Sequence, residues 1–183
     1  MTNMCLSGGA EGADLQWGMT AGSAGHEVVH WSFRGHKTAA PPVEVVVLTD
    51  LQLESADPYL ARANKTLKRG LKRSDFVLNL LRRNWYQVEH ADRLYAVSEI
   101  SGPKVRGGTG WAVQMFIDRH QGLPCEAYVF DQIRAKWFCW KGEWVEIDQP
   151  PVPHGVWAGI GTRKLNEAGK AAIRSLLGWV KPA

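Results

Sequence analysis

Two glycine-rich stretches constrain the fold of this chain more than any other feature. The first reads "SGGAEGAD" at residues 7–14, and the second reads "RGGTGWAVQ" at residues 106–114. Each follows an apolar run typical of a strand and precedes an apolar spacing typical of a helix. Glycine accepts positive φ and lets a ligand approach the backbone, while the helix that follows presents its positive end. The pair therefore predicts two anion-binding loops at one edge of a sheet.

Strand-like and helix-like patterns alternate along most of the chain. This order predicts the α/β class, with a doubly wound parallel sheet and helices on both faces. The expected strands lie at residues 3–7, 26–31, 45–48, 93–100 and 125–131, and the expected helices lie at 11–24, 57–70, 74–88, 110–120 and 165–177.

Two features fall outside this alternation. Residues 137–140 and 143–147 flank Lys141-Gly142, which suits a tight turn and predicts a Trp-rich β-hairpin added at the edge of the sheet. A third turn precedes the last helix and contains Gly159, Gly161, Thr162 and Arg163. We expect it to be structural, and contact with the ligand is the alternative.

Length and composition predict one globular domain over residues 1–183. Of the 183 residues, 45% are hydrophobic and 22% are charged, which excludes a disordered or fibrous chain. The formal net charge of +4 favours anionic partners, without the basic stripe of a dedicated nucleic-acid binder. The three scattered cysteines predict neither a disulfide framework nor a metal site. No apolar run approaches the ~20 residues that cross a bilayer, so we expect a cytoplasmic protein with no membrane partner.

Both glycine stretches resemble motifs of the SLOG superfamily, a Rossmann-like group that includes the lonely-guy phosphoribohydrolases and the DNA-processing protein A family. The stretch at 7–14 is similar to the first motif, and "GGTGWAVQ" is similar to the second. "RRNWYQVEHADRLYAV" and "AGIGTRKL" also resemble blocks of a poorly characterised branch that reads GGAxGAD and GGTGWA. The resemblance implies a Rossmann-like fold and a ligand related to AMP, ADP-ribose or NAD, held between the two loops.

The resemblance leaves catalysis open. The lonely-guy motif P-G-G-x-G-T-x-x-E falls on residues 106–114, where Gln114 replaces its catalytic glutamate. An amide cannot ionise to stabilise the charge that develops on ribose as the glycosidic bond breaks. The resemblance therefore implies a sensor or ligand-binding module with no certain cofactor. The alternative is a divergent nucleotide or nucleoside-phosphate N-glycosidase, with Glu99 as the first candidate for the acid and Asp14 as the second.

The candidate ligand contacts come from the two glycine stretches and from a polar cluster between them. An arginine fork suits bidentate contact with phosphate, although solvated surface arginines are an alternative. Asp14 could orient a ribose hydroxyl or be stabilised by the helix dipole alone. Trp111 could stack on a base or pack in the core. The full set, which includes no metal ligand, is Ser7, Gly8, Gly9, Gly12, Asp14, Arg82, Arg83, Asn84, Gly107, Gly108, Thr109, Gly110, Trp111 and Gln114.

Three further expectations concern charge and assembly. Glu11 would repel a phosphate, so we expect its side chain to face solvent. A basic run favours a second alternative, binding of single-stranded nucleic acid, if its members share one helical face. Superfamily relatives commonly form oligomers, so the resemblance implies a homo-oligomer. The basic run is Lys65, Lys68, Arg69, Lys72 and Arg73, and the side chains that could contact an outer phosphate are His30, Arg34, His36 and Lys37.

Overall fold

The computed structural model describes residues 2–121, 123 and 125–178. One eight-stranded sheet runs through them in the order β3-β2-β1-β10-β4-β7-β8-β9. The strands of this sheet are β1 (Met4–Ser7), β2 (Glu27–Phe33), β3 (Val45–Leu48), β4 (Arg93–Ser98), β7 (Ala127–Asp131), β8 (Lys136–Trp140), β9 (Trp144–Ile147) and β10 (Val156–Gly161). The first six strands in spatial order are parallel, and β8 and β9 are antiparallel. The predicted α/β class with a mostly parallel sheet is confirmed.

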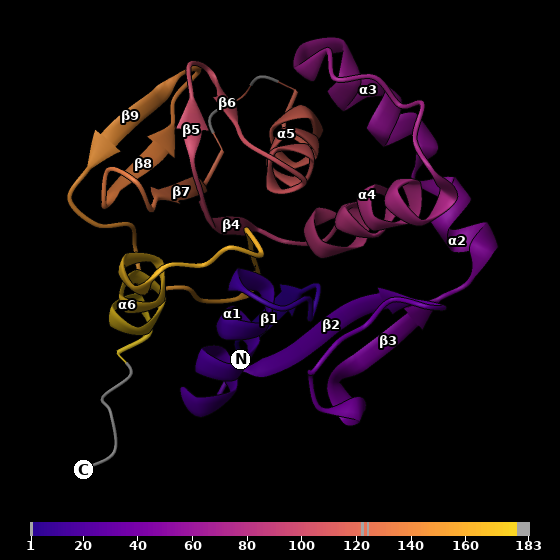
Figure 1. The fold of residues 1–183 in the computed structure, drawn as a ribbon. Helices are drawn as coiled ribbons and strands as arrows, with labels where there is room; N and C mark the ends of the chain where they lie inside the picture. Colours follow the sequence, from indigo (N-terminus) through magenta and orange to yellow (C-terminus); the bar gives the residue numbers. More distant parts are fainter. Residues whose placement is uncertain (1, 122, 124, 179–183) are drawn as a thin grey trace.

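Six α-helices flank the sheet, and a short antiparallel pair stands apart from it. Figure 1 shows α1 and α6 on one side of the sheet and α3, α4 and α5 on the other. The helices are α1 (Ala13–Ser23), α2 (Asp50–Ser55), α3 (Asp57–Leu67), α4 (Asp75–Val88), α5 (Thr109–Arg119) and α6 (Glu167–Leu176), with a 3₁₀ turn η1 at Pro42–Glu44. The separate pair is β5 (Ile100–Ser101) and β6 (Lys104–Val105).

Strand β4 shows how the sheet separates two cores. Its side chains alternate between the faces, as the pleat of a strand requires. Leu94 and Ala96 pack with residues of α3, α4 and α5, whereas Tyr95 and Val97 pack with residues of α1 and α6. All four are fully buried, so both faces of this strand are covered. The prediction of helices on both faces is confirmed.

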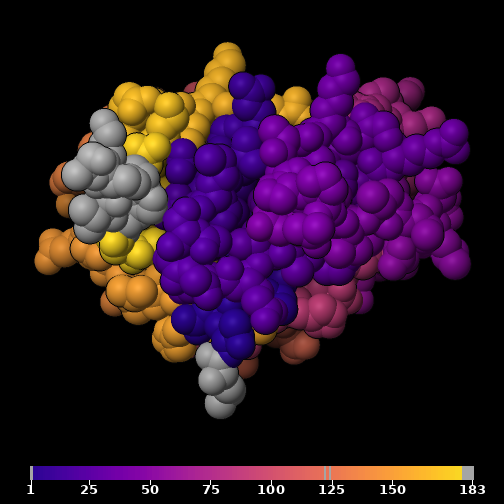
Figure 2. Space-filling model, turned by 90° about the horizontal axis from the view of Figure 1, so that it is seen from below, coloured from indigo at the N-terminus to yellow at the C-terminus, as the bar shows by residue number. Residues whose placement is uncertain are grey.

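A strand from the first ten residues and a strand from the last thirty residues are neighbours in the middle of the sheet. β10 lies between β1 and β4 and is parallel to both. Figure 2 shows the consequence from below, with N-terminal residues in indigo directly beside C-terminal residues in yellow. Segments more than 150 residues apart, such as Met4 and Val156, are therefore partners in one ladder.

The prediction of a turn over residues 159–163 is wrong for its two glycines. Gly159 and Gly161 lie inside β10, and only Thr162 and Arg163 follow the strand. Glycine is unfavourable in a strand unless a neighbour approaches closely, which is why "VWAGIG" did not read as one. A Cβ on Gly159 would lie 2.8 Å from Cβ of Trp17 in α1. The glycine is therefore explained by the packing of α1 on the sheet.

The basic run does not share a helical face. α3 begins at Asp57 with Pro58 in its first turn, as predicted, but it ends at Leu67. Lys68 follows in a left-handed conformation with φ 54°, which turns the chain away from the helix axis. The remaining members lie in the connection to α4, so the prediction of one cationic helical face is wrong. The Trp-rich hairpin, by contrast, is confirmed as β8 and β9 at the sheet edge. Within the part of the chain that the structure describes, every helix is too short or too polar to span a bilayer.

Trp157 of β10 provides a test of the core beneath α1. It is fully buried, with its ring centroid 5.6 Å from that of Trp17 and 5.7 Å from that of Tyr95. Trp157→Ala should lower the free energy of unfolding by about 3–5 kcal/mol, because it leaves a large cavity. Urea denaturation measures this loss. Val152→Ala, at a side chain that is 59% exposed, is the control, and an equal loss in both variants would contradict the assignment of β10 to the core.

Candidate functional site

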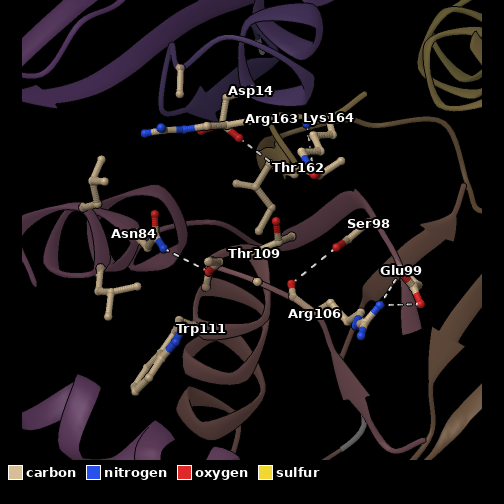
Figure 3. A pocket seen from close by; sticks show the side chains of 18 of the residues that line it. Asp14, Asn84, Ser98, Glu99, Arg106, Thr109, Trp111, Thr162, Arg163 and Lys164 are labelled. Atoms are coloured by element: carbon tan, nitrogen blue, oxygen red, sulfur yellow. Dashed lines mark hydrogen bonds and ion pairs between the residues drawn. The ribbon is translucent and has the colours of Figure 1, made fainter. Parts of the chain in front are cut away.

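A cavity of about 770 Å³ opens at the carboxyl ends of β1, β10 and β4. Figure 3 shows Asp14 and the segment 162–164 on one side of it, with Thr109 and Arg106 facing them. The remaining wall comes from α4 and from the connection that precedes it. Parallel α/β sheets bind ligands in this position, because loops from neighbouring strands converge there.

Asp14 is buried at one wall of the cavity and is held by three donors. Its carboxylate accepts the backbone N–H of Gly161 at 2.9 Å and Nε2 of Gln87 at 3.2 Å. Nη1 of Arg83 lies 3.5 Å from the same carboxylate. Burial raises the pKa of Asp14, while the charge of Arg83 and the two hydrogen bonds act in the opposite direction. The carboxylate thus joins α1, β10 and α4.

The first glycine loop is closed by protein groups. The carbonyl oxygen of Gly8 accepts Nη1 of Arg83 at 2.5 Å, and that of Gly9 accepts Oγ1 of Thr38 at 2.6 Å. A Cβ on Gly8 would lie 1.7 Å from Nη1 of Arg83. A Cβ on Gly9 would lie 2.4 Å from Oγ1 of Thr38. Glycine is required here because side chains of this protein fill the space.

The second glycine loop is open. Gly107 and Gly108 are exposed, and a Cβ on either would meet no atom within 4 Å. Arg69, which also lines the cavity, donates to the carbonyl oxygens of Gly107 at 2.9 Å and Val105 at 2.7 Å. Nδ2 of Asn84 donates to the carbonyl oxygen of Gly108 at 3.2 Å. The loop is therefore anchored through its carbonyl groups.

Cationic side chains outnumber acidic ones around the cavity. Glu99 pairs with Arg106 at 3.0 Å, and Asp14 is accompanied by Arg83. The guanidinium of Arg163 has no hydrogen-bond partner within the described range. The six cations that line the cavity are Arg69, Arg73, Arg83, Arg106, Arg163 and Lys164, and the two acids are Asp14 and Glu99. This excess favours an anionic ligand. Across residues 2–121, 123 and 125–178, no group of three or more His, Cys, Asp or Glu side chains could hold a metal ion.

The wall next to α4 is apolar. Val77, Leu80 and Leu81 line it together with Ile160 of β10. Trp111 also contributes to the lining but is only 2% exposed, so most of its surface packs in the core. The cavity thus combines an apolar wall with a cationic one, which suits a ligand that has a flat apolar part and a charged part.

The structure brings about half of the predicted contacts together. Glu99, the candidate acid, lines the cavity, and Glu11 is exposed as expected. The predicted ligand contacts that line the cavity are Asp14, Arg83, Asn84, Gly107, Gly108, Thr109 and Trp111. Those that do not are Ser7, Gly8, Gly9, Gly12, Arg82, Gly110 and Gln114.

The predicted contacts that do not line the cavity include residues with partners elsewhere in the fold. Arg82 points to α3 and binds the carboxylate of Asp57 at 2.7 Å. Gln114 donates to Asp118 one turn further along α5 at 2.8 Å. Gly110 is required by packing, because a Cβ there would lie 2.0 Å from a backbone oxygen of β6. Gln114, where the resemblance implies a glutamate in related enzymes, is therefore outside the cavity lining.

The segment after β10 forms one wall of the cavity. Thr162 and Arg163 were expected in a structural turn, with contact to the ligand only as the alternative, yet both line the cavity together with Lys164. Gln132 and Asn166 join them through hydrogen bonds between the segments, with Asn166 Nδ2 donating to the carbonyl oxygen of Gln132 at 2.9 Å. The signal that could have found this wall is a Thr-Arg-Lys sequence directly after an apolar run, once that run is read as a strand.

Comparison with known proteins gives a match at the level of fold. No protein-family model matches the chain, and no curated protein matches it in sequence. A crystal structure from Syntrophus aciditrophicus SB, of a protein with the provisional name molybdenum carrier protein, is similar with a TM-score of 0.57 and 14% sequence identity. The similarity covers 97% of this chain and 94% of that one. At this identity the match supports the Rossmann-like α/β fold alone.

The contrast between the two glycine loops predicts opposite effects of alanine. Gly8→Ala should destabilise the protein by about 1–3 kcal/mol, because the new methyl group overlaps the buried Arg83 and its neighbours. Gly108 has φ −61° and ψ −34°, a conformation that alanine adopts readily. Gly108→Ala should leave stability unchanged or raise it by up to about 1 kcal/mol. Chemical denaturation of both variants measures the difference, and equal losses would contradict the open second loop.

His36 predicts a pH dependence of stability. Burial and the charges of Arg83 and Arg163 lower its pKa from 6.5 to about 4. Between these pH values the unfolded chain binds more protons than the folded chain, so the free energy of unfolding decreases as the pH falls. His36→Gln should make that decrease shallower in denaturation curves taken across this range. His90→Gln, at an exposed side chain, is the control, and an unchanged slope in His36→Gln would refute the prediction.

Proposed function

We propose that this protein binds a nucleotide or nucleotide-derived phosphate ligand in the cavity, as a sensor or ligand-binding module. The observation that carries the proposal is the charge of the lining, in which six cationic side chains face two acids that each accompany an arginine. Such an arrangement leaves a net positive potential for an anion to neutralise. The exposed loop at Gly107 and Gly108, at the start of α5, adds backbone donors to it.

The shape of the cavity supports a ligand with two chemical parts. A phosphate suits the side formed by Arg163 and Lys164, which Arg106 faces across the cavity. A base suits the apolar wall, where the side chains of Val77 and Leu80 are partly exposed. A volume of about 770 Å³ is in the range that encloses a molecule of this size.

The geometry gives less support to the N-glycosidase alternative. Glu99 is engaged by Arg106 at 3.0 Å, and Gln114 has turned to Asp118. Asp14 is already satisfied by three donors. Release of a free base from AMP that is abolished in Glu99→Gln would establish the enzymatic alternative.

The structure gives little support to binding of single-stranded nucleic acid, because the basic run does not form one cationic helical face. The basic run is divided between the end of α3 and the connection that follows. Arg69, one of its members, is bound to carbonyl groups of the second loop. Salt-dependent binding of oligonucleotides that persists in Arg163→Ala would restore this alternative.

Isothermal titration calorimetry with AMP, ADP-ribose and NAD tests the proposal. At least one of them should bind, and Arg163→Ala or Lys164→Ala should weaken binding by about tenfold or more, the value of one charge-assisted hydrogen bond. Lys65→Ala, which removes an exposed cation outside the cavity, is the matched control and should bind as the wild type does.

Molybdate serves as a further probe because of the name given to the structural neighbour. Heat with molybdate and none with any nucleotide would indicate that the ligand is an inorganic oxyanion and not a nucleotide. Absence of heat with every probe would refute the proposal.

A further inference from the structure

The cavity contains two ion pairs that differ in their exposure. The side chains of Arg83 and Asp14 are 6% and 7% exposed. Those of Arg106 and Glu99 are 62% and 37% exposed. Opening a buried pair leaves an uncompensated charge, whereas an exposed pair contributes little and exchanges partners readily. The pair of Glu99 and Arg106 is therefore the one that an anionic ligand can open.

The contact between Glu99 and Arg106 leaves most of the guanidinium available. Both carboxylate oxygens of Glu99 lie 3.0 Å from the same atom, Nη1 of Arg106. The strongest arginine–carboxylate contact instead uses two nitrogens, each bound to one oxygen. Nε and Nη2 of Arg106 have no hydrogen-bond partner among the residues that the structure describes. A ligand anion can approach these two nitrogens or replace the carboxylate at the third.

The backbone places the acid beside this cation. Arg106 donates its N–H to the carbonyl oxygen of Glu99 at 2.9 Å, next to the antiparallel pair β5 and β6. The two residues therefore close the base of a short hairpin, and their side chains leave adjacent positions. Figure 3 shows both side chains at the cavity, joined by dashed lines. The fold itself thus supplies an anion at Arg106.

Cations elsewhere in the lining are not neutralised in this way. Arg163 and Lys164 lie on the facing wall, and neither side chain forms an ion pair with an acid within the described range. Arg69 donates to backbone carbonyl groups, which leave its charge uncompensated. Glu99 is therefore the exposed carboxylate among the residues that line the cavity. Because like charges repel, it offsets one cation and also opposes an incoming anion.

We infer that Glu99 is a specificity-determining residue, which competes with the anionic group of the ligand for Arg106 and so weakens binding in proportion to the negative charge of the ligand. The inference rests on the proposed function and adds to it what limits the affinity for highly charged ligands. A carboxylate that accepted a ligand hydroxyl, or that acted as a catalytic acid, would have the opposite effect, because its loss would weaken binding or turnover. The sign of the change in affinity therefore separates these roles.

Calorimetry on Glu99→Gln with adenosine, cyclic AMP and AMP tests the competition. The three ligands share a base and a sugar, and AMP carries about twice the negative charge of cyclic AMP. The affinity for AMP should rise about fivefold or more, that for cyclic AMP should rise less, and that for adenosine should stay the same. A lower affinity for AMP, or an equal gain for all three ligands, would overturn the inference.

Glu27→Gln is the matched control because it removes the same charge far from the cavity. Glu27 is exposed and begins β2, at the opposite end of the parallel strands from the cavity. All three affinities should equal those of the wild type. A gain for AMP as large as that in Glu99→Gln would show an effect of net charge alone and would refute the inference.

The same measurement in an Arg106→Gln background tests whether Arg106 is the shared partner. In this background there is no guanidinium for Glu99 to release, so Glu99→Gln should raise the affinity for AMP less than it does in the wild-type background. An equal gain in both backgrounds would show repulsion at a distance and would overturn the competition for Arg106.

The failure of the inference and that of the proposed function have different signatures. If neither the wild type nor Glu99→Gln binds any nucleotide, the proposed function fails and the inference fails with it. If the wild type binds AMP and Glu99→Gln binds it no more tightly, only the inference fails.

Discussion

The buried carboxylate of Asp14 is the interaction on which the candidate site depends. It lies in the first turn of α1, accepts the N–H of Gly161 at the end of β10, and stands beside Arg83 from α4. Three elements far apart in the chain thus meet at one acid. Leaving either partner of such a buried pair uncompensated costs about 3–5 kcal/mol, so the pair holds both sides of the sheet edge in place.

The two similar glycine motifs have different surroundings. The glycines of the first loop make room for Arg83, which pairs with Asp14, and for Thr38 and the backbone of Thr162. Around the second loop no such filling occurs, and Gly108 borders open space. A glycine-rich turn between a strand and a helix can therefore serve packing as well as ligand approach, and its spacing alone does not distinguish the two uses.

Local patterns were sufficient for most of the fold but not for its central strand. Alternating strands and helices predicted the α/β class, and Lys141-Gly142 predicted the edge hairpin. The strand β10 was missed because two glycines weaken its pattern, and their reason, contact with Trp17, comes from another part of the chain. Five cations near residue 69 were expected on one helix because the left-handed turn at Lys68 has no strong sequence signal.

By itself, the sequence determined the α/β class and most of its elements, where the glycine loops stand, and that the chain carries an excess of positive charge. The tertiary structure decided which loop is open, because that depends on side chains distant in sequence. Arg83 closes the first loop from α4, and Arg69 and Asn84 anchor the carbonyl groups of the second. It also placed Arg163 at the cavity, because only the pairing of β10 between β1 and β4 brings that residue to the edge where the ligand is expected.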